Sequence, residues 1–201
     1  DLPWAFDFFQ ALRRIDARQP GKPRLGTALR PVDEPVRLGQ APEMAFAPAA
    51  LHAVHPPQGT RPPRLEVLFF GLFGPNGPLP LHLTEYARNR AMHHADPTMV
   101  RFVDLFHHRL LLLFYRAWAQ AQPVVGRDRP GDDSFADIVG SLIGVGIPEM
   151  RGRDPMADEI KLHFAGLLTR QVRNADGLAH LLSGYLGRRV RVEQFAGHWM
   201  A

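Results

Sequence analysis

The side chains best suited to chemistry lie in one short stretch of the chain: His93, His94, Asp96, His107 and His108. Imidazoles and carboxylates bind zinc when three or four of them converge, so a metal-dependent hydrolase built on these histidines is one hypothesis. The spacing argues against it. The histidines of each pair are adjacent, neighbours on a helix point about 100° apart, and the chain has no His-Glu-x-x-His pattern. We therefore predict that no metal binds here.

Nucleophilic and phosphate chemistry have still less support. The serines are Ser134, Ser141 and Ser183, and none of them lies in a Gly-x-Ser-x-Gly turn. The glycine-rich residues 71–77 lack the Gly-Lys-Ser/Thr ending of a phosphate loop, and Pro75 has no backbone N–H to donate. We predict a protein that is not an enzyme and that has no cofactor.

Composition limits the remaining classes of function. The 201 residues carry a formal net charge of +4, which raises a third hypothesis, a nucleic-acid adaptor with steeply salt-dependent binding. However, the only lysines are Lys22 and Lys161, and the arginines are scattered rather than gathered with the aromatics that stack on bases. The sequence also lacks an apolar run of about 20 residues, the length that crosses a bilayer. We predict neither a nucleic-acid partner nor direct membrane insertion.

Residues 65–118 are the stretch around which the other elements are arranged. Residues 65–70 are apolar and rich in β-forming types, which predicts a buried strand. Residues 74–78 read Gly-Pro-Asn-Gly-Pro, a pattern typical of a turn with Pro75 and Asn76 at its centre.

Two helices are predicted after this turn. Thr84 is expected to cap the first, and Asp96 followed by Pro97 predicts the start of the second, over residues 97–121. Residues 110–114, in the middle of the second helix, are apolar on every side. This is typical of a helix in a core or in an interface.

The flanking segments predict shorter elements. We expect an amphipathic helix over residues 4–19, strands at 36–38 and 44–46, a loop at 123–131, helices at 135–143, 154–169 and from Asp176 to Gly187, and a half-buried strand at 188–195. The sequence thus predicts an α+β fold, predominantly helical with short strands and long Pro/Gly-rich loops, as in assembly subunits. Its division is expected between residues 1–122 and 123–201, the second part being a smaller helix-helix-strand subdomain.

Several segments carry a family resemblance. The most specific are FFGLFGPNGPLPLHLTEYA and DPTMVRFVDLFHHRLLLLFYRAWA, flanked by FDFFQALRRID, PRLGTALRPVDEPVRLGQ and GLAHLLSGYLGRRVRVEQFAGHW. They resemble the TssG family, also called ImpH or VasB, whose members are baseplate subunits of the bacterial type VI secretion system. The resemblance covers most of the chain. Members of that family generally continue further, so it implies that this chain is C-terminally truncated or only partly ordered.

The resemblance implies a structural role in the baseplate wedge, bridging TssF-like, TssK-like and TssE-like subunits. It also implies a cytoplasmic location, within a baseplate docked to the inner-membrane complex. The side chains expected at interfaces are Trp4, Phe8, Phe69, Phe70, Phe73, Pro75, Asn76, Leu112 and Phe114. For Phe73 an alternative stays open, in which the ring packs on the 97–121 helix and completes the core.

Overall fold

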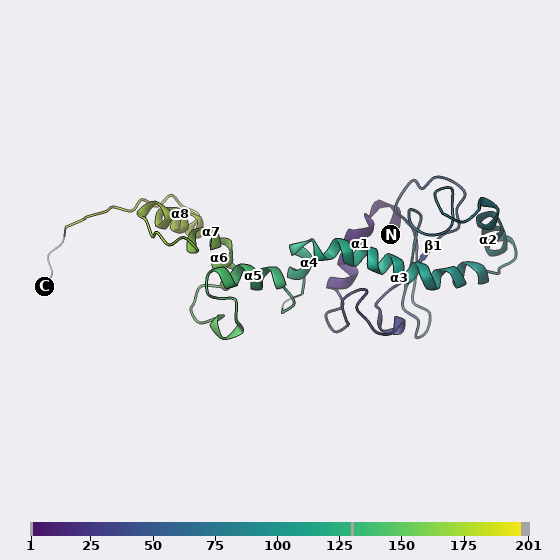
Figure 1. The fold of residues 1–201 in the computed structure, drawn as a ribbon, viewed down its shortest axis with the longest axis horizontal. Coiled ribbons are helices and arrows are strands. Elements are labelled where there is room, and N and C mark those ends of the chain that lie inside the picture. Colours follow the sequence, from purple (N-terminus) through teal and green to yellow (C-terminus); the bar gives the residue numbers. More distant parts are fainter. Residues whose placement is uncertain (1, 130, 198–201) are drawn as a thin grey trace. The chain divides into compact units, whose positions relative to one another are not determined.

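The computed structural model describes residues 2–129 and 131–197. They belong to two compact units, which divide after Arg129 and are described separately below. Most of the regular structure is helical, and the strands form one small sheet (Figure 1). The predicted α+β, predominantly helical fold is therefore confirmed. Within the described residues, no helix has the length and apolar character needed to cross a membrane.

The first unit combines a small sheet with one long helix. Its elements are η1 (Pro3–Ala5), α1 (Phe8–Ala17), η2 (Pro31–Asp33), β1 (Arg37–Gln40), β2 (Leu51–His55), β3 (Arg64–Val67), α2 (Leu81–His93), α3 (Thr98–Gln120) and α4 (Pro123–Arg127). The long helix α3 lies within one residue at each end of the range predicted from Asp96-Pro97.

The first helix starts later than expected. The Asp7 carboxylate accepts a hydrogen bond from the backbone N–H of Gln10 and so caps α1. Trp4 consequently lies outside the helix, in the short 3-10 turn η1. The prediction of a continuous helix over residues 4–19 was wrong because Asp7 sets a new helix start.

The sheet has the order β1-β3-β2, with β1 parallel and β2 antiparallel to β3. The strand predicted at 65–70 ends at Val67, so Phe69 and Phe70 lie beyond it. The strand predicted at 36–38 corresponds to β1, whereas residues 44–46 are not a strand and the third strand is β2, further along the chain. Pro42 and Pro48 flank residues 44–46, which prevents regular pairing there.

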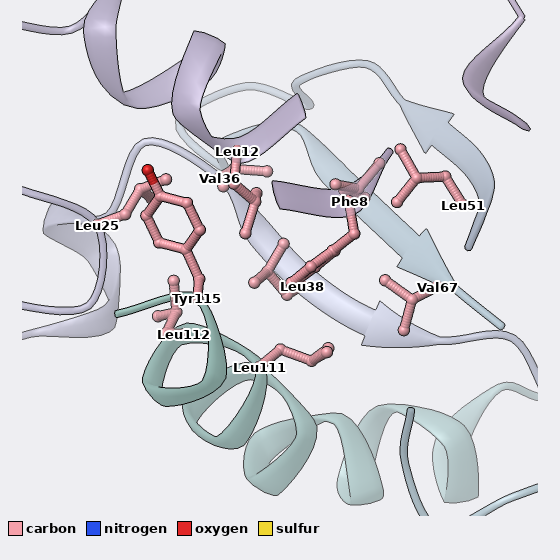
Figure 2. Close-up of a cluster of buried hydrophobic side chains, with 11 residues drawn as sticks. Phe8, Leu12, Leu25, Val36, Leu38, Leu51, Val67, Leu111, Leu112 and Tyr115 are labelled. Atoms are coloured by element: carbon pink, nitrogen blue, oxygen red, sulfur yellow. The ribbon is translucent and has the colours of Figure 1, made fainter. Parts of the chain in front are cut away.

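The core of this unit lies between α1, the sheet and α3. Figure 2 shows apolar side chains from these elements converging on one another. The buried members are Phe8, Leu12, Leu25, Val36, Leu38, Leu51, Leu65, Val67, Leu111, Leu112 and Tyr115. A second, smaller cluster joins α2 to the first half of α3 through Phe73, Ala87, Val100 and Val103.

The segment after α3 belongs to the first unit because a buried ion pair holds it there. Asp16 of α1 is 2% exposed, and its carboxylate pairs with Arg129 at 2.8 Å and with Arg24 at 2.9 Å. Arg129 also donates to the carbonyl of Lys22. The units accordingly divide after Arg129 rather than at residue 122, and residues 123–127, expected as a loop, form α4.

The second unit is a set of short helices. They are α5 (Ser134–Leu142), η3 (Pro148–Met150), α6 (Asp158–His163), α7 (Ala165–Leu168) and α8 (Ala175–Leu186). Asp133 caps α5, and Gly187, the predicted end of its helix, ends α8 in the left-handed conformation.

Three expectations for the second unit were wrong. The helix predicted over 154–169 is divided between α6 and α7 at Phe164. The helix expected from Asp176 starts at Ala175 instead, because the side-chain oxygen of Asn174 accepts the N–H of Gly177 and caps α8. Residues 188–195 alternate like a strand, but within residues 131–197 no strand exists to pair with them, so they remain irregular.

Candidate interaction surface

Helix α3 has a buried inward face and an exposed outward face. The inward face repeats at intervals of three and four residues and combines apolar with polar side chains: Val100, Val103, Asp104, His107, His108, Leu111, Leu112 and Tyr115. The outward face carries a second apolar series, which we call the outer stripe: Phe102, Leu105, Phe106, Leu110, Leu113 and Phe114. These six side chains are between 40% and 67% exposed.

The outer stripe has the geometry of a helix-docking face. Its members recur at helical spacing over three turns, so they lie along one side of a single rigid element. Phe102 and Phe106 contact each other edge to face, with ring centroids 5.9 Å apart. Exposed apolar side chains gathered on one side of a helix are typical of surfaces that bind another protein.

At the end of the stripe, Phe114 joins an aromatic cluster formed by Phe8, Phe9, Phe69, Phe70, Phe114 and Trp118. Phe114 stacks on Phe70 at 5.4 Å and lies 5.3 Å from Phe9, which in turn stacks on Trp118 at 4.9 Å. Phe69 contacts Phe8 edge to face at 5.1 Å. The cluster is buried at Phe8 and open to solvent at Phe69 and Phe114, so core packing holds its exposed rings in place.

The turn after Phe70 is held firmly against the sheet. The Gln40 side chain accepts the N–H of Phe73 at 2.9 Å and donates to the carbonyl of Phe73 at 2.8 Å. His107 Nε2 accepts the N–H of Leu72 at 2.9 Å. Gly71 permits this approach, because a Cβ there would lie 2.2 Å from the Gln40 amide oxygen and 2.8 Å from His107 Nε2. Its φ of +144° also favours glycine.

The tip of the turn contains Pro75 and Asn76, both exposed. Gly77 donates to the carbonyl of Gly74 at 3.0 Å, which closes the predicted β-turn. Thr84, predicted as a helix cap, instead lies buried inside α2, and its hydroxyl accepts the N–H of Gly74 at 3.0 Å. The helix starts earlier than expected, directly after Pro80.

A buried polar network fastens α3 to the sheet. The Asp104 carboxylate accepts the N–H of Gln40 at 3.0 Å, pairs with Arg64, and lies 3.2 Å from His107 Nδ1. Because His107 Nε2 is the acceptor for Leu72, its Nδ1 is the nitrogen that carries the proton toward Asp104. Asp104 therefore pairs with the half-buried Arg64 and orients His107 at the same time.

His108 makes a second link of the same kind. Its Nδ1 accepts the backbone N–H of Leu38 at 3.1 Å, while its Nε2 is buried without a hydrogen-bond partner. Burial, reinforced by the nearby charges of Arg37 and Arg109, lowers the pKa of His108 to about 4. The imidazole is therefore neutral at neutral pH.

The expected interface residues have different positions. Phe8, Phe73 and Leu112 are 1%, 2% and 1% exposed, so the interface assignment of these three is corrected to a core role. Phe73 packs on α2 and α3, the alternative left open by the sequence. The others reach the surface wholly or in part: Trp4, Phe69, Phe70, Pro75, Asn76 and Phe114.

Sequence reasoning missed most of the outer stripe. Phe102, Leu105 and Phe106 are not among the predicted interface residues, because the continuous apolar run that starts at Leu110 is the stronger pattern in the sequence. The signal was nevertheless present, since residues 102, 105, 106, 110 and 113 repeat at helical spacing with a different phase from the buried series.

The histidines are not assembled into a metal site. His93 and His94 are exposed at the end of α2, whereas His107 and His108 are buried and each accepts a backbone N–H. In the part of the chain that the structure describes, no three His, Cys, Asp or Glu side chains converge on a position where a metal could bind. The hydrolase hypothesis therefore has no geometric support.

Comparison with known families agrees with the resemblance. The family model described as "Type VI secretion, TssG" matches residues 2–201, nearly the whole chain. No curated protein and no solved structure matches. The chain therefore belongs to the TssG family and is a component of the type VI secretion baseplate.

Proposed function

We propose that this chain is a structural subunit of the baseplate wedge that binds its neighbours through the outer stripe of α3 and the open edge of the aromatic cluster. Its role is architectural and involves no catalysis. TssF-like, TssK-like and TssE-like subunits are the proposed partners. The assembly acts in the cytoplasm, where the baseplate docks on the inner-membrane complex.

The observation that carries the proposal is the outer stripe itself. A helix whose inward face already fills a core needs no apolar outward face for folding, and exposing one lowers solubility. Its phenylalanines and leucines lose little conformational entropy when a partner covers them, since α3 is already rigid. The exposed edge of the aromatic cluster extends this surface through Phe69.

The test is a charge placed on the stripe. Leu105, 67% exposed, is replaced in Leu105→Glu, and the chain is co-expressed with TssF, TssK and TssE. We expect co-purification with at least one partner to be lost, because a carboxylate would be buried at the interface without a partner. The melting temperature of the variant alone should change little, since glutamate is a good helix former.

Leu29→Glu is the matched control. Leu29 is also in the first unit and is fully exposed in a loop, so it receives the same substitution away from the stripe. It should retain every partner that the wild type binds. Retention of every partner by Leu105→Glu would contradict the proposed role of the stripe.

A further inference from the structure

The second unit buries very little of its own side-chain surface. Among residues 131–197 only Gly140 and Ala165 are buried, and neither has a large side chain. Large apolar side chains are exposed instead, including Val172 at 75%, Leu178 at 49% and Leu186 at 56%. Hydrophobic burial is the main favourable term in folding, so this unit gains stability when a further apolar segment covers it.

An apolar groove lies between α7 and α8. It encloses about 380 Å³, within the size range of roughly 300–1,000 Å³ that ligand sites occupy. Its apolar lining consists of Leu167, Leu168, Val172, Leu178, Leu181 and Val192. The residues on α8 are spaced by three, so the helix presents one continuous apolar side to the groove.

The charged side chains that line the groove are both positive. Arg170 and Arg173 are its charged lining residues, and no carboxylate lines it. Both arginines are exposed, and neither makes an ion pair with another described residue. Elsewhere in the same unit Arg151 pairs with Asp137, and Lys161 pairs with Asp154 and Asp158. An apolar floor with two unpaired guanidinium groups complements an apolar segment that carries carboxylates.

We propose that this groove binds an acidic amphipathic helix from a partner protein. Leucine-like side chains at intervals of three and four would fill the groove, as in other helix-in-groove complexes. Carboxylates beside them would pair with Arg170 and Arg173, whose planar guanidinium groups suit bidentate pairing. The groove and the outer stripe share no residue, so this proposal does not depend on the role of the stripe.

The experiment uses the whole chain and two labelled helical peptides, followed by fluorescence anisotropy. Both peptides have leucines at positions i, i+3, i+7 and i+10, with glutamate at the flanking positions of one and lysine in the other. The glutamate peptide is expected to bind about tenfold more tightly, as two partly exposed ion pairs allow. The double variant Arg170→Glu, Arg173→Glu should reverse this preference.

Two controls locate the binding. Arg18→Glu with Arg61→Glu, an equal charge change on exposed residues of the first unit, should leave the preference unchanged. Leu105→Glu should also leave it unchanged, since that substitution affects the outer stripe alone. Loss of peptide binding in Leu105→Glu would place the peptide on the stripe and overturn the groove proposal.

The apolar part of the proposal has its own variant. Val172→Ser changes a groove residue that is 75% exposed, so it disturbs folding little, and it should weaken binding of the glutamate peptide severalfold. Amide hydrogen exchange should become slower in α8 when the peptide binds. Equal binding of both peptides, or binding that depends on the arginines but not on Val172, would overturn the proposal in favour of simple attraction of polyanions.

Discussion

The imidazole of His108 accepts the backbone N–H of Leu38 over 3.1 Å, and this bond joins α3 to the outer edge of the sheet. One turn earlier in α3, Asp104 accepts the N–H of Gln40 in the same way. Four residues of helix rise about 6 Å and two residues of strand about 6.6 Å, so the two spacings match. Strand β1 is therefore closed on its free side by side chains, which prevents it from pairing with another chain.

The pH dependence of stability should report the bond to His108. Its pKa falls from 6.5 when unfolded to about 4 when folded. As pH drops from 6.5 to 4, the unfolded chain takes up a proton that the folded chain excludes, so stability is lost with falling pH. At pH 5.5 the loss from this group is about 1.4 kcal/mol. Urea unfolding at pH 7.5 and 5.5 measures it.

His108→Asn and His108→Leu separate the two properties of the imidazole. Asparagine keeps an acceptor for the N–H of Leu38 but cannot be protonated in this pH range. The free energy of unfolding of His108→Asn should therefore change less with pH than that of the wild type. Leucine removes the acceptor and leaves a buried N–H unpaired, which should cost about 1–3 kcal/mol at pH 7.5. If all three proteins show the same loss between pH 7.5 and 5.5, His108 is not the titrating group.

The sequence predicted the elements whose signals are local. The long helix α3, the Gly-Pro-Asn-Gly turn, helix α5 and the end of α8 at Gly187 all lie within one residue of their predicted positions, because each depends on a few neighbouring residues. The contacts of the histidines could not be predicted in this way. The hydrogen bonds of His108 to β1 and of His107 to the turn join segments more than thirty residues apart, and no local pattern encodes such a contact.

The site was predicted less well than the fold for a related reason. Phe8, Phe73 and Leu112 are large apolar residues in apolar segments, as Phe69 and Phe114 are. Only tertiary packing decides which of them face inward. The same applies to α3, where the sequence indicated only that residues 110–114 are apolar on every side. Which side of the helix fills the core depends on where Asp104 and His108 meet the sheet.

Phe73 provides a direct test of the core assignment. Phe73→Asp places a charge among the apolar side chains of Ala87, Val100 and Val103. Removing the ring alone should cost about 3–5 kcal/mol, and burying a carboxylate among apolar side chains adds to this. Thermal melting of the isolated chain measures the loss. The matched control is Phe46→Asp, the same change at a ring that is 75% exposed, and it should melt like the wild type. Normal melting of Phe73→Asp would contradict the core position.

The outer stripe should also make the isolated chain associate with itself. Without a partner, its six apolar side chains remain in water, and pairing two stripes would remove them from it. Light scattering should therefore show species larger than a monomer that grow with concentration, and a dye that fluoresces in apolar surroundings should bind.

The double variant Leu105→Glu, Phe106→Lys should shift the chain toward the monomer and reduce dye binding, because the two charges must be desolvated when stripes pair. Leu29→Glu should associate as the wild type does, since its leucine lies off the stripe. A wild-type chain that stays monomeric at high concentration and binds no dye would mean that this face is already covered within the chain, and the stripe would then lose its place as a docking surface.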